Sequence, residues 1–209
     1  MEKTRKPLLH DWLIKPLLLA KADKVSAFTT MIVMIACITI SGCIVGTQGR
    51  PKNSPPPVTV PSVDLQRYGG TWYEIARYPN SFQKKCEGVT AHYEVRADGR
   101  VGVTNTCAHG TSSGKPRAVK GIASVIAGSN NAKLAVNFTP IPLPKGQGNY
   151  WVLYLDSAYQ TALVGGPNGD YLWLLARTPK ITPAQRTALN DAALQNGYRI
   201  DLLKDTIQP

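Results

Sequence analysis

Apolar and polar residues alternate in short stretches from residue 63 to the end of the chain. Val89, Ala91 and Tyr93, for example, are separated by polar residues, and a period of two indicates a half-buried β-strand. We count eight such segments, at about 70–78, 88–97, 100–107, 117–127, 132–139, 149–155, 160–165 and 170–177. Because no helix-length segment separates them, we expect an all-β fold, an eight-stranded antiparallel up-and-down β-barrel whose closure leaves no free edges.

Residues typical of turns separate the predicted strands. Asp98-Gly99 is the strongest hairpin signal, and a two-residue turn there would place Ala97 opposite Arg100. Pro140–Gly148 contains three prolines and predicts a longer loop. The strands should therefore follow one another around the barrel through short connections.

One helix is expected after the strands. Thr182 and Gln185 form the pattern of a capping box, with Pro183 at the first helical position. Gly197 stands where a helix typically ends, and Tyr198–Ile207 is expected to form a short final strand. The helical residues predicted to face the barrel wall are Leu189, Ala193 and Leu194.

The amino-terminal part of the chain has a different composition. Residues 1–42 carry scattered basic residues, then the ten-residue apolar core Met31–Ile40, then small residues, which is typical of a secretory signal peptide. This apolar run is shorter than the about 20 residues that a transmembrane helix needs. Residues 43–62 are rich in Pro and Gly and predict a tether, partly polyproline II. Residues 63–209 then form the only predicted globular domain.

The segment Ile40-Ser41-Gly42-Cys43 resembles a bacterial lipobox. This resemblance implies that the leader is cut before Cys43 and that Cys43 receives diacylglycerol and becomes a lipid anchor. Ile44, rather than Asp, follows the Cys, and in enterobacterial sorting this implies the cell outer membrane, with the domain facing the periplasm. The alternatives are an uncleaved anchor or a buried structural Cys.

The formal net charge of the chain is +11. Residues 1–42 contain six Lys or Arg and three Asp or Glu, so the remaining chain carries +8. This excess is spread over the domain and favours anionic surfaces such as phospholipid headgroups. Nucleic acid is disfavoured as a partner, because no predicted helix has a basic face and no zinc knuckle is present.

Three short motifs follow one another along the domain. They are G-x-W at Gly70 and Trp72, D-x-x-Y at Asp156 and Tyr159, and a late Arg177. Together with the eight strands and the lipobox, this set resembles the lipocalins, and in particular the bacterial outer-membrane lipocalins, over nearly the whole domain. The resemblance implies that Arg177 stacks on Trp72 at the closed end of the barrel, and that these five residues are structural.

The same resemblance implies a calyx, a barrel that holds one small hydrophobic molecule such as a fatty acid or a lysophospholipid. Alternation by itself fits a side-chain-filled barrel equally well. Glu74 shares the parity of Trp72, which predicts a polar contact inside the barrel or, equally, a satisfied carboxylate in a polar network. No cofactor or metal is expected, and a homodimer stays open. The side chains predicted to line the calyx are Tyr93, Val103, Val136, Phe138, Tyr150, Val152, Tyr154 and Trp173.

Two cysteines, Cys86 and Cys107, lie in the predicted domain, and an oxidising periplasm favours a disulfide between them. A two-residue turn at the hairpin would place Cys107 opposite Thr90, so Phe82–Glu87 would have to fold back to bring Cys86 close. The alternative is a redox-active or nucleophilic Cys.

An enzyme is disfavoured by the sequence. His10, His92 and His109 form no metal-ligand pair at typical spacing beyond the weak Cys107–His109 combination, and no nucleophile elbow is visible. We therefore expect a membrane-anchored binding protein for lipid storage, transport or envelope maintenance. The alternatives are an interaction module with a filled barrel and functional loops, or a lipocalin-type enzyme.

Overall fold

The computed structural model describes residues 49–141, 146 and 148–209. The leader 1–42, the expected anchor Cys43 and the first residues of the tether lie outside this part. Among the described residues, no helix is long and apolar enough to cross a membrane. The strands are β1 (Gly70–Arg77), β2 (Cys86–Val95), β3 (Val101–His109), β4 (Pro116–Val125), β5 (Lys133–Asn137), β6 (Tyr150–Leu155), β7 (Thr161–Gly165) and β8 (Leu172–Ala176).

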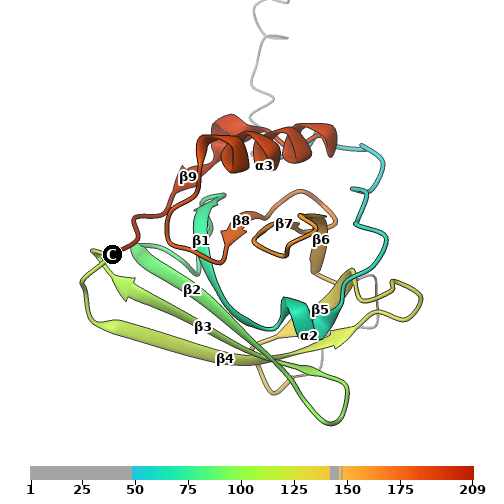
Figure 1. The fold of residues 1–209 in the computed structure, drawn as a ribbon, viewed down its shortest axis with the longest axis horizontal. Helices are drawn as coiled ribbons and strands as arrows, with labels where there is room; N and C mark the ends of the chain where they lie inside the picture. Colours follow the sequence, from blue (N-terminus) through green and yellow to red (C-terminus); the bar gives the residue numbers. More distant parts are fainter. Residues whose placement is uncertain (1–48, 142–145, 147) are drawn as a thin grey trace, which may run out of the picture. The chain divides into compact units, whose positions relative to one another are not determined.

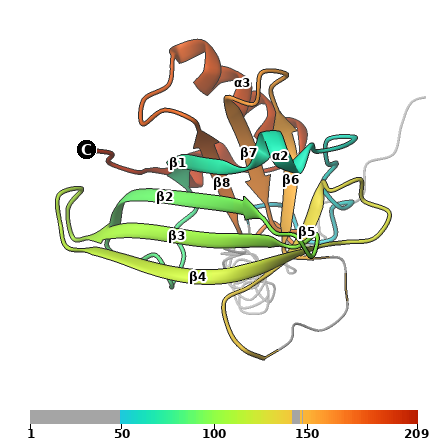
Figure 2. The same ribbon diagram turned by 60° about the horizontal axis from the view of Figure 1, so that its bottom comes forward.

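Each strand pairs with the next in antiparallel fashion, and β1 closes the sheet by pairing with both β8 and β2. In Figure 2, β2, β3 and β4 form one curved layer, and the remaining strands close the barrel around it. The eight-stranded antiparallel up-and-down barrel expected from the alternation is therefore confirmed, and each predicted segment overlaps one of these strands.

The helix α3 (Pro183–Gln195) packs on the outside of the barrel against β6 and β7 (Figure 1). It begins with the expected capping box, in which the Thr182 side chain accepts a hydrogen bond from the Gln185 backbone N–H. The buried residues Leu189 and Ala193 face the barrel, as predicted. Leu194 is 51% exposed, so its predicted contact is wrong. Its position, five residues after Leu189, turns it away from the face that i and i+4 share.

The predicted final strand Tyr198–Ile207 is mostly wrong. Ile200–Leu202 forms a 3-10 turn, η1, and only β9 (Lys204–Asp205) pairs with β1. Tyr198 is buried under α3 and donates a hydrogen bond from its hydroxyl to the carbonyl of Gly166, 2.8 Å away. This anchor bends the chain away from extended structure before β9.

The hairpin between β2 and β3 has a three-residue turn instead of the predicted two-residue turn. The backbone N–H of Arg96 donates to the carbonyl of Arg100 at 2.9 Å, and Val95 pairs with Val101. Gly99 has φ of +77°, in the left-handed region that this type of turn requires. Ala97 therefore does not lie opposite Arg100, and the register moves by one residue.

A β-bulge between Glu87 and Thr90 brings the two cysteines of the domain together. Without the bulge, Cys86 would point out of the barrel, because a one-residue change of register reverses the face of a side chain. With it, Cys86 pairs with His109 and forms a disulfide with Cys107. The expected disulfide is present, but the expected fold-back of residues 82–87 is not needed. A loop of this length stabilises the fold by about 3 kcal/mol in the chain-entropy model.

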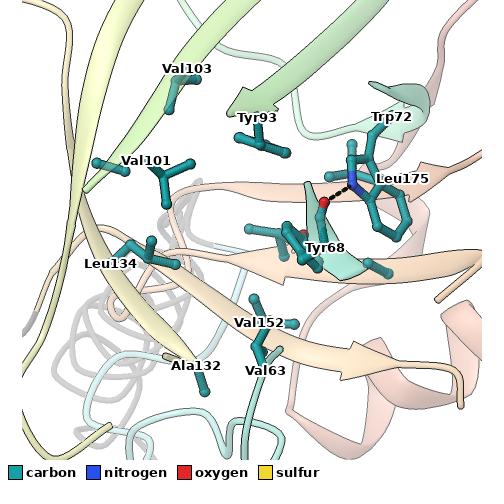
Figure 3. Packing of buried hydrophobic residues seen from close by; sticks show 13 residues of the cluster. Val63, Tyr68, Trp72, Tyr93, Val101, Val103, Ala132, Leu134, Val152 and Leu175 are labelled. Atoms are coloured by element: carbon teal, nitrogen blue, oxygen red, sulfur yellow. Dashed lines mark hydrogen bonds between the residues drawn. The ribbon is translucent and has the colours of Figure 1, made fainter. Parts of the chain in front are cut away.

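Two hydrophobic clusters form, one inside the barrel and one between the barrel and α3. Figure 3 shows part of the inner cluster, with Tyr93, Val103 and Val152 projecting from β2, β3 and β6. A register shift in β6 after Val152 moves Tyr154 into the outer cluster. The prediction from parity that Tyr154 points into the calyx is therefore wrong.

The short helix α2 (Leu65–Tyr68) lies at one end of the barrel, beside Trp72 and Arg177. Trp72 is fully buried, and its indole N–H donates to the carbonyl of Tyr68 at 2.8 Å (Figure 3). The guanidinium carbon of Arg177 lies 4.0 Å from the centre of the Trp72 ring. Gly70 has φ of +86°, and a Cβ there would lie 3.4 Å from the Arg177 side chain, so a larger residue would strain this end.

Arg177 also ties three chain segments together at this end. Its guanidinium donates to the carbonyls of Arg67, Thr71 and Tyr159 at 2.7, 3.0 and 3.2 Å. Tyr159 belongs to the turn after β6, in which the Asp156 carboxylate accepts hydrogen bonds from the backbone N–H groups of residues 158 and 160. This group of contacts closes the barrel end.

Replacing Arg177 by Lys is expected to destabilise the fold. The ammonium group cannot lie flat on the indole and donate to three carbonyls in fixed directions at once. We predict a loss of about 1–3 kcal/mol in the free energy of unfolding, measured by denaturant titration. Ligand affinity per folded molecule should change little.

Arg100→Lys is the matched control, because the Arg100 side chain is exposed and, among the described residues, bonds only to Asp98 in the β2–β3 turn. Its free energy of unfolding should stay within about 0.5 kcal/mol of the wild-type value. An unchanged midpoint for Arg177→Lys, together with lost ligand binding, would place Arg177 in a binding site and contradict this account of the closed end.

Candidate ligand-binding cavity

A cavity of about 660 Å³ occupies the barrel at the end opposite Trp72 and Arg177. It is lined by residues of β2 and β3, by the start of β4, and by residues in or next to β5, β6 and β8. Trp72 and Arg177 lie at the other ends of β1 and β8, so the barrel is closed on their side and open on this one. The volume is in the range typical of pockets for small molecules.

The walls of the cavity are mainly apolar. Val89 and Ala91 from β2, Val103 from β3 and Leu175 from β8 line it, as alternate residues of strands should. Six of the eight residues predicted to line a calyx surround this cavity, and they are Tyr93, Val103, Val136, Phe138, Tyr150 and Trp173. Val152 lines a smaller void of about 20 Å³ next to the closed end. Tyr154, in the outer cluster, lines neither space.

Three tyrosines form the floor between the large cavity and the small void. The Tyr150 hydroxyl lies 2.8 Å from the hydroxyl of Tyr68 and 3.0 Å from that of Tyr93. Tyr93 and Tyr150 line both spaces, whereas Tyr68 lines only the small void. Burial raises the pKa of Tyr93 to about 12 and also raises the pKa values of Tyr68 and Tyr150 well above their usual range. All three are therefore neutral at physiological pH.

Aromatic side chains surround the mouth of the cavity. Tyr171 stacks on Trp173, with ring centroids 5.5 Å apart, and Phe82 contacts Tyr171 at 5.6 Å. Phe82 is 62% exposed and Phe138 is 40% exposed, although both line the cavity. A mouth of this kind offers apolar surface to a molecule that enters from solvent or from a lipid surface.

The charge at the mouth is mostly positive. Lys84 on the β1–β2 loop and Arg117 at the start of β4 line the cavity, and Lys85 and Lys115 lie on the loops next to them. None of these four exposed side chains forms an ion pair with another residue in the described ranges. Asp170, in the turn between β7 and β8, is an exposed acid at this end. The mouth therefore favours an anionic group over a cationic one.

Glu74 lies at the cavity wall within a buried polar network. The sequence left open whether this residue makes a polar contact inside the barrel or is a satisfied carboxylate in such a network. Its carboxylate accepts hydrogen bonds from Arg77 at 2.6 Å, Thr206 at 2.5 Å and Gln83 at 2.7 Å. Gln83 in turn accepts a hydrogen bond from the indole N–H of Trp173 at 3.1 Å. The network therefore satisfies Glu74 and orients Trp173 at the mouth.

The carboxyl-terminal tail closes the barrel behind this wall, where β1 and β2 separate. Beyond Tyr73, β1 no longer pairs with β2. Ile207 bridges the gap, since its carbonyl accepts from the Gly88 N–H at 2.7 Å and its N–H donates to the Glu87 carboxylate at 2.7 Å. The side chain of Gln208 donates to the carbonyl of Val89 at 3.0 Å. No local pattern could have indicated this pairing, because it depends on where β1 bends.

The described residues hold no group of three or more His, Cys, Asp or Glu side chains that could bind a metal ion. The cysteine sulfurs at the cavity, Cys86 and Cys107, are bonded to each other. His92 is exposed on the outer face, where its ring lies 3.0 Å from the Thr71 hydroxyl. The chemistry that this geometry supports is the burial of an apolar molecule.

Comparison with known proteins agrees with this geometry. A family model described as a lipocalin-like domain matches residues 63–208. Temperature-induced lipocalin-1 of Arabidopsis thaliana is 39% identical over 155 residues, which cover 71% of this chain and 81% of that protein. The outer membrane lipoprotein Blc of Citrobacter freundii is 33% identical over 177 residues, covering 84% of this chain and 96% of that protein.

Solved structures show the same fold at lower sequence similarity. The cockroach allergen Per a 4 superposes with a TM-score of 0.56 at 18% identity, covering 76% of this chain and 97% of that one. At such low identity the likeness concerns the barrel alone.

The floor tyrosines predict a loss of stability at high pH. Because burial raises the pKa of Tyr93 to about 12, folding favours its neutral form. This contribution is complete below about pH 10, where a tyrosine of the unfolded chain ionises, and it is lost as the pH rises through about 12. We expect the denaturant midpoint to fall between these two pH values, and to fall less in Tyr93→Phe.

Tyr154→Phe serves as the control, because Tyr154 packs on the outside of the barrel and is not part of the floor. Its midpoint should follow the wild type over the same pH range. If Tyr93→Phe and the wild type lose stability equally between pH 10 and pH 12, the floor phenol is not protected by burial.

Proposed function

Because this chain belongs to the lipocalin family, we propose that its barrel binds a fatty acid or a lysophospholipid for lipid storage, transport or maintenance of the cell envelope. The observation that carries the proposal is the cavity of about 660 Å³, with apolar walls, a closed floor and a cationic mouth. A cavity of this size also speaks against the alternative of a barrel filled by its own side chains.

The size of the hydrophobic effect makes such a ligand reasonable. Burying a dozen methylene groups gains about 10 kcal/mol before the costs of binding are subtracted. Ordering of the acyl chain and loss of its free motion reduce this gain, so that an affinity of about micromolar is expected.

The mouth suggests how an amphiphile is oriented. Lys84 and Arg117 are exposed at the cavity rim, where a carboxylate or phosphate can meet them while it stays partly hydrated. Glu74, the acid in the wall, is already bonded to Arg77, Thr206 and Gln83. We therefore place the anionic headgroup at the mouth and the acyl chain inside the barrel.

The proposed location is the outer membrane, with a lipid on Cys43 and the domain facing the periplasm. The lipobox-like segment before Cys43 supports this proposal, as does the similarity to proteins that are named outer membrane lipoproteins. The Pro-rich residues between Cys43 and the barrel would then separate the domain from the membrane.

The proposal predicts saturable binding that depends on the mouth. Residues 49–209 contain the whole barrel, α3 and both hydrophobic clusters, so this segment is suitable for titration with a fluorescent fatty acid. Trp173→Arg puts a charge into the cavity wall and should weaken binding at least about tenfold, since a buried unpaired charge is costly.

Leu194→Arg is the matched control, because it adds the same charge at an exposed position on α3. Its affinity should equal that of the wild type, and circular dichroism should show that both variants are folded. The absence of saturable binding by the wild type would refute the proposed function, and equal affinity of the Trp173→Arg variant would refute the location of the site.

A further inference from the structure

The hydroxyls of Tyr68, Tyr93 and Tyr150 carry one more proton than their mutual contacts can use. Two short contacts join the three oxygens, both of them to Tyr150. Each neutral phenol has one O–H donor, which gives three donors for two hydrogen bonds. Whichever way the two bonds point, one O–H is left without an acceptor among the described residues.

The surroundings of the trio leave this donor unmet. The small void on its far side is otherwise lined by apolar side chains, including Val63, Leu134 and Val152. A buried donor without an acceptor is unfavourable, because it has lost its bond to water and gained nothing in return. The large cavity, which Tyr93 and Tyr150 line, is the space from which an acceptor can reach it.

Asn105, on the same inner face, has a hydrogen-bond acceptor without a donor. Its side-chain oxygen is buried and has no hydrogen-bond partner in the described structure. Asn105 pairs with Ala91 on β2, whereas Tyr93 pairs with Val103, so Asn105 and Tyr93 are diagonal neighbours one layer apart. This oxygen is enclosed by protein atoms and is not exposed to the cavity, so the tyrosine hydroxyls are the polar groups that a ligand meets at the floor.

We propose that the deep end of the cavity is a binding subsite for a hydroxyl group of the ligand. A hydroxyl can accept a hydrogen bond from the tyrosine trio and can donate one to a phenol oxygen of the trio, whereas a methyl terminus can do neither. With an anionic headgroup at Lys84 and Arg117, the ligand class is a long-chain acid that carries a hydroxyl near its far end. This inference rests on the proposed function and narrows the ligand.

A water molecule in the small void is the competing way to satisfy the trio. The void of about 20 Å³ is large enough for one water, but a buried water normally makes two to four hydrogen bonds. Among the residues that line it, only the tyrosine hydroxyls offer side-chain partners. A hydroxyl carried on an apolar chain in the large cavity reaches the trio without the entropy cost of immobilising a separate water.

The test needs a variant that removes the donors from the cavity. A single change at Tyr93 is insufficient, because Tyr68 and Tyr150 would still have two donors for one hydrogen bond. Tyr93→Phe combined with Tyr150→Phe removes both hydroxyls that line the large cavity and leaves Tyr68 facing the small void. Tyr154→Phe, outside the barrel, is the matched control.

The measurement is the affinity of residues 49–209 for dodecanoic, tetradecanoic and hexadecanoic acids and for their ω-hydroxy forms, by isothermal titration calorimetry. For each chain length, we compare the dissociation constants of the plain acid and its ω-hydroxy form. Their ratio cancels the contributions of the shared headgroup and of most of the hydrocarbon. For the chain length that reaches the floor, the double variant should shift this ratio against the hydroxy acid by about 3- to 10-fold, the worth of one hydrogen bond. Tyr154→Phe should leave it unchanged.

The outcomes separate this inference from the proposed function. If plain acids bind and the double variant leaves every ratio unchanged, the hydroxyl subsite is refuted and the lipid-binding function stands. If the double variant instead weakens the plain acids more than the hydroxy acids, the carboxylate lies at the floor and the proposed orientation is wrong. If no acid binds the wild type, the proposed function itself fails.

Discussion

The contact between Arg177 and Trp72 is the constraint on which the rest of this barrel depends. A planar guanidinium lies 4.0 Å from the centre of a fully buried indole and donates to backbone carbonyls of three separate segments. These segments are α2, the start of β1 and the turn after β6. Because one side chain holds them together, the barrel is closed at this end, and any large internal space has to lie at the other.

The open end then has a consistent physical character. Aliphatic side chains line the walls, stacked aromatic rings surround the mouth, and the exposed charges there are mainly positive. Glu74 faces this space, but its carboxylate is paired with Arg77 and accepts hydrogen bonds from Gln83 and Thr206. Three tyrosine hydroxyls make the floor polar again. The cavity thus has a charged mouth, mainly apolar walls and a polar floor. This order suits an elongated amphiphile better than a compact polar molecule.

The sequence predicted the strands well because alternation directly reflects which face of a strand is buried. It failed where the register changes. Cys86 reaches Cys107 through a bulge in β2, and Tyr154 leaves the inner face through a register shift in β6. Both irregularities depend on the partner strand, so a pattern read along one strand does not contain them. The chain after Tyr198 was misjudged for a related reason, since long-range contacts such as those of the Tyr198 and Tyr78 hydroxyls hold it. The tyrosine floor was not predicted, because Tyr68 comes from α2, and alternation assigns inward-facing residues only within strands.

The open cavity of this barrel should hold one amphiphilic molecule. The most direct measurement is native mass spectrometry of residues 49–209 purified under non-denaturing conditions from bacteria and incubated with a bacterial lipid extract, followed by identification of the released molecule. We expect one non-covalent adduct per protein molecule, an anionic amphiphile with a single long chain. Protein that remains free of adduct after exposure to the extract, while still folded, would contradict this expectation.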